Sequence, residues 1–136
     1  MGIFLGSRHQ KFASEDSAPR HGSHVAGDIC FNHDFKPGGV SHWVAYGIPA
    51  SVSGFAEGEV SAPSSKYVGG TSLMKLSNYF GPCTPPGPSH HYTFTLMATD
   101  LEPTALAPGL TRDEAIKALE GHVKQATGLI GTFSKP

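Results

Sequence analysis

The chain has 136 residues, which is enough for one domain but not for two. Its 17 glycines and 11 prolines are too many for a helical bundle, and its 38% hydrophobic content is too high for a disordered tail. Basic and acidic residues nearly balance at a net charge of -1 without a cationic cluster, which excludes an electrostatic nucleic-acid footprint.

Residues 1–27 are polar and show no periodicity, so we expect an irregular segment that precedes a domain of residues 28–136. Within that domain, a turn signal at residues 36–39 follows a short apolar run. Residues 41–49 are rich in types that favour buried strands and end at a proline. They predict the first strand.

The middle of the chain is dominated by glycine, serine and proline. Residues 50–80 fit either one long excursion or a few short strands. The prolines of residues 81–89 exclude a helix or a central strand and predict a rigid loop, with a cis bond before proline as one way of fixing its shape. Residues 91–98 alternate apolar side chains with threonine and predict the clearest strand of the chain.

A helix is predicted to begin at Thr111, because Thr111 and Glu114 have the spacing of a capping box. Apolar side chains follow at helical spacing as far as Val123, and Gly128 is the expected stop. Residues 129–133 then suit a last short strand. The sequence therefore predicts a mainly β domain with a C-terminal helix.

No apolar run approaches the about 20 residues that span a bilayer, and the first residues lack the apolar core of a secretory signal. We therefore expect a cytoplasmic protein without a transmembrane segment. Cys30 and Cys83 can form one disulfide, but two reduced thiols are expected in that compartment.

Histidines and a tyrosine near the proline loop are the candidates for chemistry. His42 stands beside Trp43 in the first predicted strand, and the loop runs directly into His90 and Tyr92, which alternation places on one face. Both residue types offer hydrogen-bond donors, so the arrangement favours a small pocket for an anion. His21 and His24, or His33 and Asp34, could in principle ligate zinc, but no matching Cys or His pair accompanies them. A phosphate-cradling glycine loop and a nucleophile elbow do not occur in the sequence, so we expect neither a metal nor a cofactor.

Three motifs resemble those of the phosphatidylethanolamine-binding proteins, and are most similar to the bacterial and archaeal Raf-kinase-inhibitor-like branch. Residues 42–50 resemble the family motif His-Trp-Val-x-x-(Asn/Asp)-Ile-Pro-Ala, and residues 81–87 resemble its Gly-Pro-x-Pro-Pro-Gly loop. Residues 90–94 resemble its His-Arg-Tyr-x-Phe strand. The likeness runs from about residue 29 to residue 136, with three uncommon motifs in the family's order.

This resemblance implies an antiparallel β-sandwich with a pocket for phosphate-like anions, including phospholipid head groups. It implies that His42 and His90 are the two pocket histidines and that Tyr92 is the tyrosine of the strand. The residues implied to form the pocket wall are Gly81, Pro82, Pro85 and Pro86. Family members also inhibit or scaffold kinases or proteases by surface contact, so a protein partner of that kind is implied.

The region before the His-Trp motif differs from the family pattern. The family carries Asp-Pro-Asp-Ala-Pro there, of which this chain keeps Asp34 and Pro37, and Asp34 is the last ligand-binding candidate. Strand motifs upstream of Ile29 are missing, and a sandwich without strands exposes an unpaired edge. We expect a homodimer to cover that edge, the alternative being that residues 3–12 fold back as a replacement strand.

The sequence as a whole predicts a binding protein that is not an enzyme. One alternative is a small hydrolase or lyase that uses His42 and His90 as acid and base, although no nucleophile or metal set accompanies them. The other alternative is a degenerate paralogue that keeps the scaffold and binds no ligand.

Overall fold

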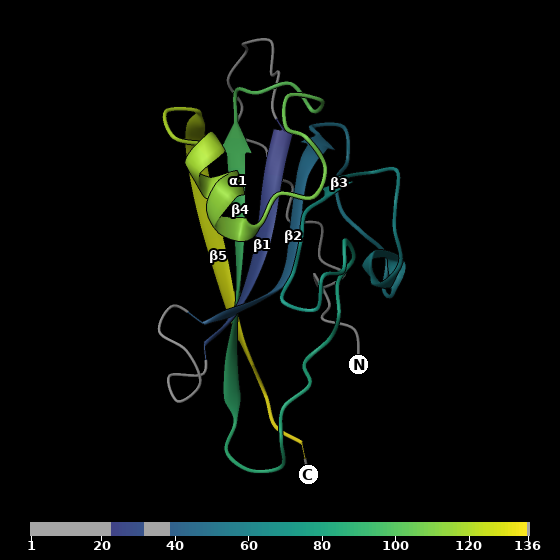
Figure 1. Cartoon of the computed structure of the whole chain (residues 1–136), viewed down its shortest axis with the longest axis vertical. Helices are drawn as coiled ribbons and strands as arrows, with labels where there is room; N and C mark the ends of the chain where they lie inside the picture. The colour runs from purple at the N-terminus through teal and green to yellow at the C-terminus, as the bar shows by residue number, and fades with distance from the viewer. Residues whose placement is uncertain (1–22, 32–38, 136) are drawn as a thin grey trace.

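A computed structural model describes residues 23–31 and 39–135 of the chain, with side chains described from residue 39 onward. In this part the strands form one antiparallel five-stranded sheet of order β3-β2-β1-β4-β5 (Figure 1). The elements in chain order are β1 (Ser23–Phe31), β2 (Val40–Pro49), the 3-10 helix η1 (Glu59–Ser61), β3 (Val68–Gly69), β4 (His90–Thr99), α1 (Arg112–Ala118) and β5 (Val123–Phe133). The predicted mainly β fold with a helix near the C-terminus is confirmed.

Strands β2 and β4 form where the sequence predicts them, at residues 40–49 and 90–99. The two strands do not pair with each other, because β1 lies between them and bonds to both. β1 begins at Ser23 and so reaches into the segment expected to be irregular. The central strand of the sheet is therefore one that hydrophobic patterning did not reveal.

A β-bulge at Gly47 changes which face the end of β2 presents. Where β1 advances by two residues, β2 advances by three. Gly47 takes a left-handed φ of 64°, and the carbonyl oxygen of Pro103 lies where a Cβ would stand. The extra residue turns Ile48 to the same face as Trp43 and Ala45.

Both faces of the sheet around β2 are covered by the chain's own loops. Figure 1 shows α1 lying across one face of the sheet, in front of β4. The buried residues of that face are Val44, Tyr46, Ala115 and Leu119. The excursion of residues 50–80 covers the opposite face, where the buried residues are Trp43, Ala45, Ile48 and Tyr67. Strand β2 thus contributes to two apolar cores, one on each side of the sheet.

Tyr46 ties the segment before α1 to the sheet. Its buried hydroxyl donates to the carbonyl of Ala107 at 2.7 Å and accepts from the amide of Leu110 at 3.0 Å. Burial raises the pKa of Tyr46 above its ordinary value, so the hydroxyl stays protonated and keeps its donor role. One buried side chain thereby bonds two backbone groups of the segment before α1.

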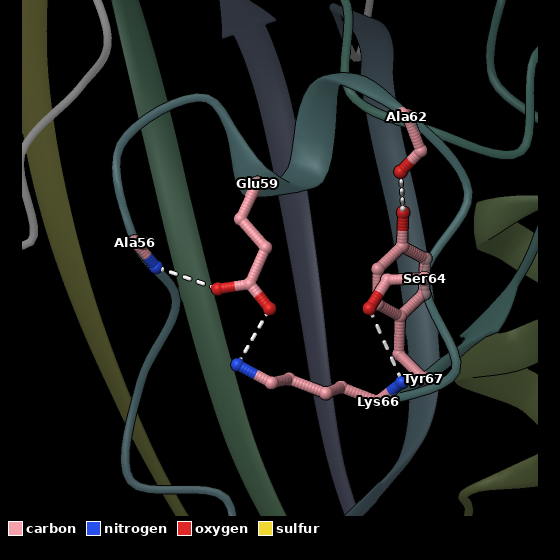
Figure 2. Close-up of polar contacts among 6 residues, drawn as sticks. All are labelled: Ala56, Glu59, Ala62, Ser64, Lys66 and Tyr67. Carbon is pink, nitrogen blue, oxygen red and sulfur yellow. Dashed lines mark hydrogen bonds and ion pairs between the residues drawn. The ribbon is translucent and has the colours of Figure 1, made fainter.

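The excursion of residues 50–80 is an ordered cover, with η1 and β3 as its regular elements. Figure 2 shows Glu59 at its centre, where the carboxylate accepts from the amide of Ala56 at 2.7 Å and pairs with Lys66. The ammonium of Lys66 also lies 5.7 Å from the ring centroid of Phe55, which packs on Trp43. These contacts hold an irregular segment in one conformation over the core.

The helix starts as predicted but is shorter than its pattern indicates. The capping box is confirmed, since the amide of Thr111 donates to the carboxylate of Glu114 at 2.8 Å and the Thr111 hydroxyl accepts the Glu114 amide. The expected stop at Gly128 is wrong, because α1 ends at Ala118 and Gly121 takes a left-handed φ of 81°. The residues that follow extend the predicted last strand into β5, which pairs with β4 along its whole length.

β5 forms one edge of the sheet, and within the described residues it bonds along β4 alone. Its side chains from residue 123 to residue 130 are exposed, including Leu129 and Ile130, which point to opposite faces. None of the helices in the described ranges is long and apolar enough to cross a membrane.

Candidate functional site

A second bulge in β2 places His42 and Trp43 on the same face of the sheet. Across this bulge β1 advances by one residue while β2 advances by two, so His42 is the inserted residue. Trp43 packs edge-on against Tyr67 and Tyr79, on the face covered by the excursion. The His42 ring meets Phe80 and Tyr92 beside them. Consecutive strand residues would otherwise point to opposite faces.

His42 is held on three sides. Its ring stacks on Phe80 with centroids 4.3 Å apart and lies nearly perpendicular to the ring of Tyr92, with centroids 5.4 Å apart. Nδ1 lies 3.3 Å from the carbonyl oxygen of Phe80. Because a carbonyl can only accept, Nδ1 carries the proton and Nε2 is the acceptor nitrogen of the neutral ring. The orientation and the tautomer of His42 are both fixed. We call His42, Phe80 and Tyr92 the His42 cluster.

Burial lowers the pKa of His42 below its ordinary value, since only 5% of the residue is exposed and the charged ring would lose its hydration. The backbone carbonyls of Phe80 and Gly81 act in the opposite direction, because their oxygens face the ring and favour its charged form. Burial is the larger effect. His42 is therefore neutral near pH 7 until something stabilises a proton on Nε2.

Strand β4 contributes Tyr92 to the cluster and places His90 nearby. Tyr92 is buried, His91 is exposed, and His90 is half-buried at the first position of the strand. His90 and Tyr92 share a face, as the sequence predicts, because β4 pairs without a bulge over this stretch. Of the β4 side chains, Tyr92 makes a described ring contact with His42, and His90 does not. Of the two predicted pocket histidines, His42 belongs to the cluster and His90 lies beside it, two residues before Tyr92 on the same face of β4.

The proline loop begins directly at the cluster, since the carbonyl of Gly81 acts on His42. Pro82 is half-buried, whereas Pro85 and Pro86 are exposed. The loop returns to the end of the chain through a parallel bridge between Pro86 and Lys135. Every peptide bond in the described ranges is trans, so the cis bond considered for this loop is not found.

Thr84 is the buried residue of this loop. Its hydroxyl makes no hydrogen bond to any described residue. The neighbouring Cys83 is a free and exposed thiol, which agrees with the expectation for that residue. Asp34 lies outside the described residues, and within those residues no group of three or more His, Cys, Asp or Glu could hold a metal ion.

Phe80 is the member of the cluster that sequence reasoning missed. It contributes both a stacking ring and the carbonyl that fixes the histidine tautomer. An aromatic residue immediately before the Gly-Pro start of the loop was the available signal. Spacing alone could not place it on His42, because 38 residues separate them in the chain.

Comparison with known proteins assigns the chain to a protein family. The sequence profile of the phosphatidylethanolamine-binding protein family matches residues 28–134. A UPF0098 protein of Pyrococcus abyssi is 36% identical over 108 residues, which are 75% of this chain and 59% of that protein. A UPF0098 protein of Pyrococcus horikoshii is 37% identical over 108 residues and 53% of its length is covered. The chain thus spans somewhat more than half the length of these relatives.

Solved structures agree with the family. A putative phosphatidylethanolamine-binding protein homologue of Chlamydia trachomatis superposes with a TM-score of 0.73 at 28% identity, over 89% of this chain and 78% of that one. Escherichia coli YbcL, described as a member of the mammalian family, superposes with a TM-score of 0.67 at 19% identity over 88% of this chain and 76% of that one, which shows a shared fold.

Proposed function

Because the chain belongs to the phosphatidylethanolamine-binding protein family, we propose that it binds a phosphate-type anion at the His42 cluster and is not an enzyme. The observation that supports this is the buried His42 ring, whose Nδ1 is committed to the Phe80 carbonyl. Its remaining nitrogen, Nε2, can accept a proton and then donate it in a hydrogen bond to an anion. The anion offsets the burial that otherwise keeps the ring neutral.

Other groups around the cluster suit an anion. Tyr92, whose ring contacts that of His42, carries a phenolic hydroxyl, and His90 lies on the same face of β4. The buried Thr84 hydroxyl in the adjoining loop offers one more donor. A phospholipid head group and inorganic phosphate present the same oxygens to such donors, so the shared chemistry is that of a phosphate.

A non-enzymatic role is favoured by what the cluster contacts. The neighbours of the His42 ring are two aromatic rings and backbone carbonyls, whereas a general base is usually oriented by a carboxylate and faces a nucleophile. A hydrolase or lyase that uses His42 and His90 is the alternative, and turnover of simple phosphate esters or thioesters by the purified chain would establish it. The kinase or protease partner and the cytoplasmic location rest on the sequence and stay predictions.

The test is a titration of the histidine ring signals by nuclear magnetic resonance, with and without inorganic phosphate. Phosphate is expected to raise the pKa of His42 and of His90, because an anion stabilises each imidazolium. Phosphate affinity should accordingly fall as pH rises through those pKa values. The exposed His91, on the opposite face of β4, is the internal control and should not respond.

Two variants make the test specific. Tyr92→Phe keeps the ring against His42 but removes one hydroxyl, and should weaken phosphate binding about three- to tenfold. His91→Gln should leave it unchanged. Phosphoethanolamine in place of phosphate shows whether the head group adds affinity. The shared site is rejected if phosphate leaves the pKa values of both His42 and His90 unaltered.

A further inference from the structure

A single turn carries half of the large apolar side chains that are exposed on the described surface. Leu73 is 58% exposed, Met74 is 61% exposed and Leu76 is 41% exposed. The others, Val123, Leu129 and Ile130, all belong to β5. We call residues 73–76 the apolar turn. Large apolar side chains gathered at one place on a surface commonly mark an interaction site.

The apolar turn is held in one conformation by the residue before it. Ser72 is buried, and its amide donates to the carbonyl of Leu76 at 3.1 Å. Its own carbonyl accepts from the amide of Lys75 at 2.9 Å, and its hydroxyl accepts from the amide of Leu76 at 3.2 Å. The exposed side chains therefore project from a closed turn and not from a frayed loop.

Lys75 gives the turn a positive charge. It is the one non-glycine residue in the described ranges with a positive φ, at 57°, and such a conformation persists only where the surroundings fix it. No acidic residue occurs between residues 68 and 81. The turn thus combines three apolar side chains with one cation and has no neighbouring carboxylate in sequence.

The apolar turn lies next to the His42 cluster. The amide of Leu73 donates to the carbonyl of Ser41 at 2.9 Å, and Ser41 directly precedes His42. On its other side the chain runs from Leu76 to Phe80, which stacks on His42. A surface that bound the turn would lie close to the cluster.

We propose that the apolar turn inserts into the surface of a phospholipid membrane and presents the His42 cluster to the phosphates of the head groups. Leucine and methionine side chains are buried among the upper acyl chains, while Lys75 stays at the level of the phosphates. The presentation of the cluster to head-group phosphates rests on the proposed phosphate binding. The insertion of the apolar turn is a separate event and can be measured by itself.

The size of the turn favours a membrane over a protein partner. A stable protein interface needs about 800 Å² from each side, which four residues cannot supply alone. Binding to a bilayer has no such minimum area: it grows with the apolar area inserted and with the attraction of cations to anionic lipids, and the apolar turn supplies both. The outer edge of β5, by contrast, pairs with no other strand in the described part of the chain, and an edge strand suits the addition of a protein strand.

The experiment is co-sedimentation of the full chain with vesicles of phosphatidylcholine and phosphatidylserine, and in parallel with vesicles of phosphatidylcholine alone. The double variant Leu73→Ser/Met74→Ser should bind both kinds of vesicle at least about tenfold more weakly. Lys75→Gln should bind the anionic vesicles about fivefold more weakly and the neutral ones as the wild type does. The control Leu73→Met/Met74→Leu exchanges the two side chains, keeps the turn apolar, and should bind like the wild type.

Phosphate binding separates this inference from the proposed function. Serine variants of the turn should bind inorganic phosphate like the wild type, with the same shift of the His42 signals. Insertion is rejected if the wild type does not bind vesicles, if the double serine variant binds as well as the control, or if that variant changes only the oligomeric state. If phosphate does not affect the histidine signals but the chain still binds vesicles, the phosphate site is rejected and the insertion of the apolar turn is retained.

Discussion

At the scale of single residues, His42 is set between two opposing effects. Burial lowers its pKa, and the carbonyl oxygens of Phe80 and Gly81, which favour the charged ring, raise it. The balance leaves a neutral ring with a fixed tautomer in the unliganded protein. A binding site with this balance takes up a proton together with its anion, so its affinity depends on pH.

This balance predicts how the stability of the fold depends on pH. The pKa of His42 is lower in the folded state than in the unfolded chain, where it is about 6.5. Below that value the unfolded state binds the proton more readily, so the free energy of unfolding falls as pH falls, by at most about 1.4 kcal/mol per pH unit. The loss stops once the pH is below the folded-state pKa.

Urea unfolding across this pH range measures the effect. Other groups also titrate, so the quantity of interest is the difference between wild type and His42→Gln, which should lack this part of the slope. His91→Gln is the matched control and should keep it, because that ring is exposed. Identical slopes for wild type and His42→Gln would contradict the buried neutral histidine.

At the scale of elements, β2 shows how local irregularity builds the site. Its two bulges each insert one residue, and each changes which side chains share a face. The bulge at His42 brings that residue beside Trp43, and the bulge at Gly47 brings Ile48 to the core around Trp43. A regular strand of the same sequence would point His42 to the face that is covered by α1.

One of the two bulges depends on the left-handed backbone of Gly47, so Gly47→Ala should destabilise the fold strongly. The side chain would need a left-handed φ and would meet the carbonyl of Pro103, and the expected loss is about 2–4 kcal/mol. Gly54→Ala is the control, because nothing lies within 4 Å of its added Cβ. Chemical denaturation of both variants checks this, and a loss for Gly47→Ala no larger than for Gly54→Ala would count against it.

At the scale of the whole molecule, β5 is an edge strand of the sheet, and among the described residues β4 is its one partner strand. Its two faces are exposed over most of its length, and Ile130 is 66% exposed. If two copies of β5 pair antiparallel about Gly128, Ala126 lies opposite Ile130 and Thr127 lies opposite Leu129. The one charged residue of β5, Lys124, then faces Thr132, so no like charges meet.

The expected homodimer is therefore predicted to form through β5. The edge that the sequence predicted lies on the N-terminal side, and residues 3–12, which could cover it, are outside the described part of the chain. Sedimentation velocity at micromolar concentration should show a dimer for the wild type. Ile130→Lys should be monomeric because it buries a charge at the new interface, whereas Met74→Lys should stay dimeric. A wild type that remains a soluble monomer would exclude the pairing.

Much of the fold was determined by the sequence alone, because those features depend on neighbours in the chain. The alternation of residues 91–98 and the composition of residues 41–49 specify strands, and the spacing of Thr111 and Glu114 specifies a helix start. The family motifs also lie in the sequence, which is why the family was recognisable before the fold was known.

Only the tertiary structure decided how these pieces meet. The apolar spacing predicts a helix as far as Val123, but Val123 is the first residue of β5. This strand pairs with β4 because the edge of β4 offers hydrogen bonds along the whole of β5. The bulge at His42 exists because β1 pairs alongside it, and Phe80 reaches His42 only after the excursion of residues 50–80 has folded onto the sheet. Register and stacking join residues that are distant in the chain, so no local pattern encodes them.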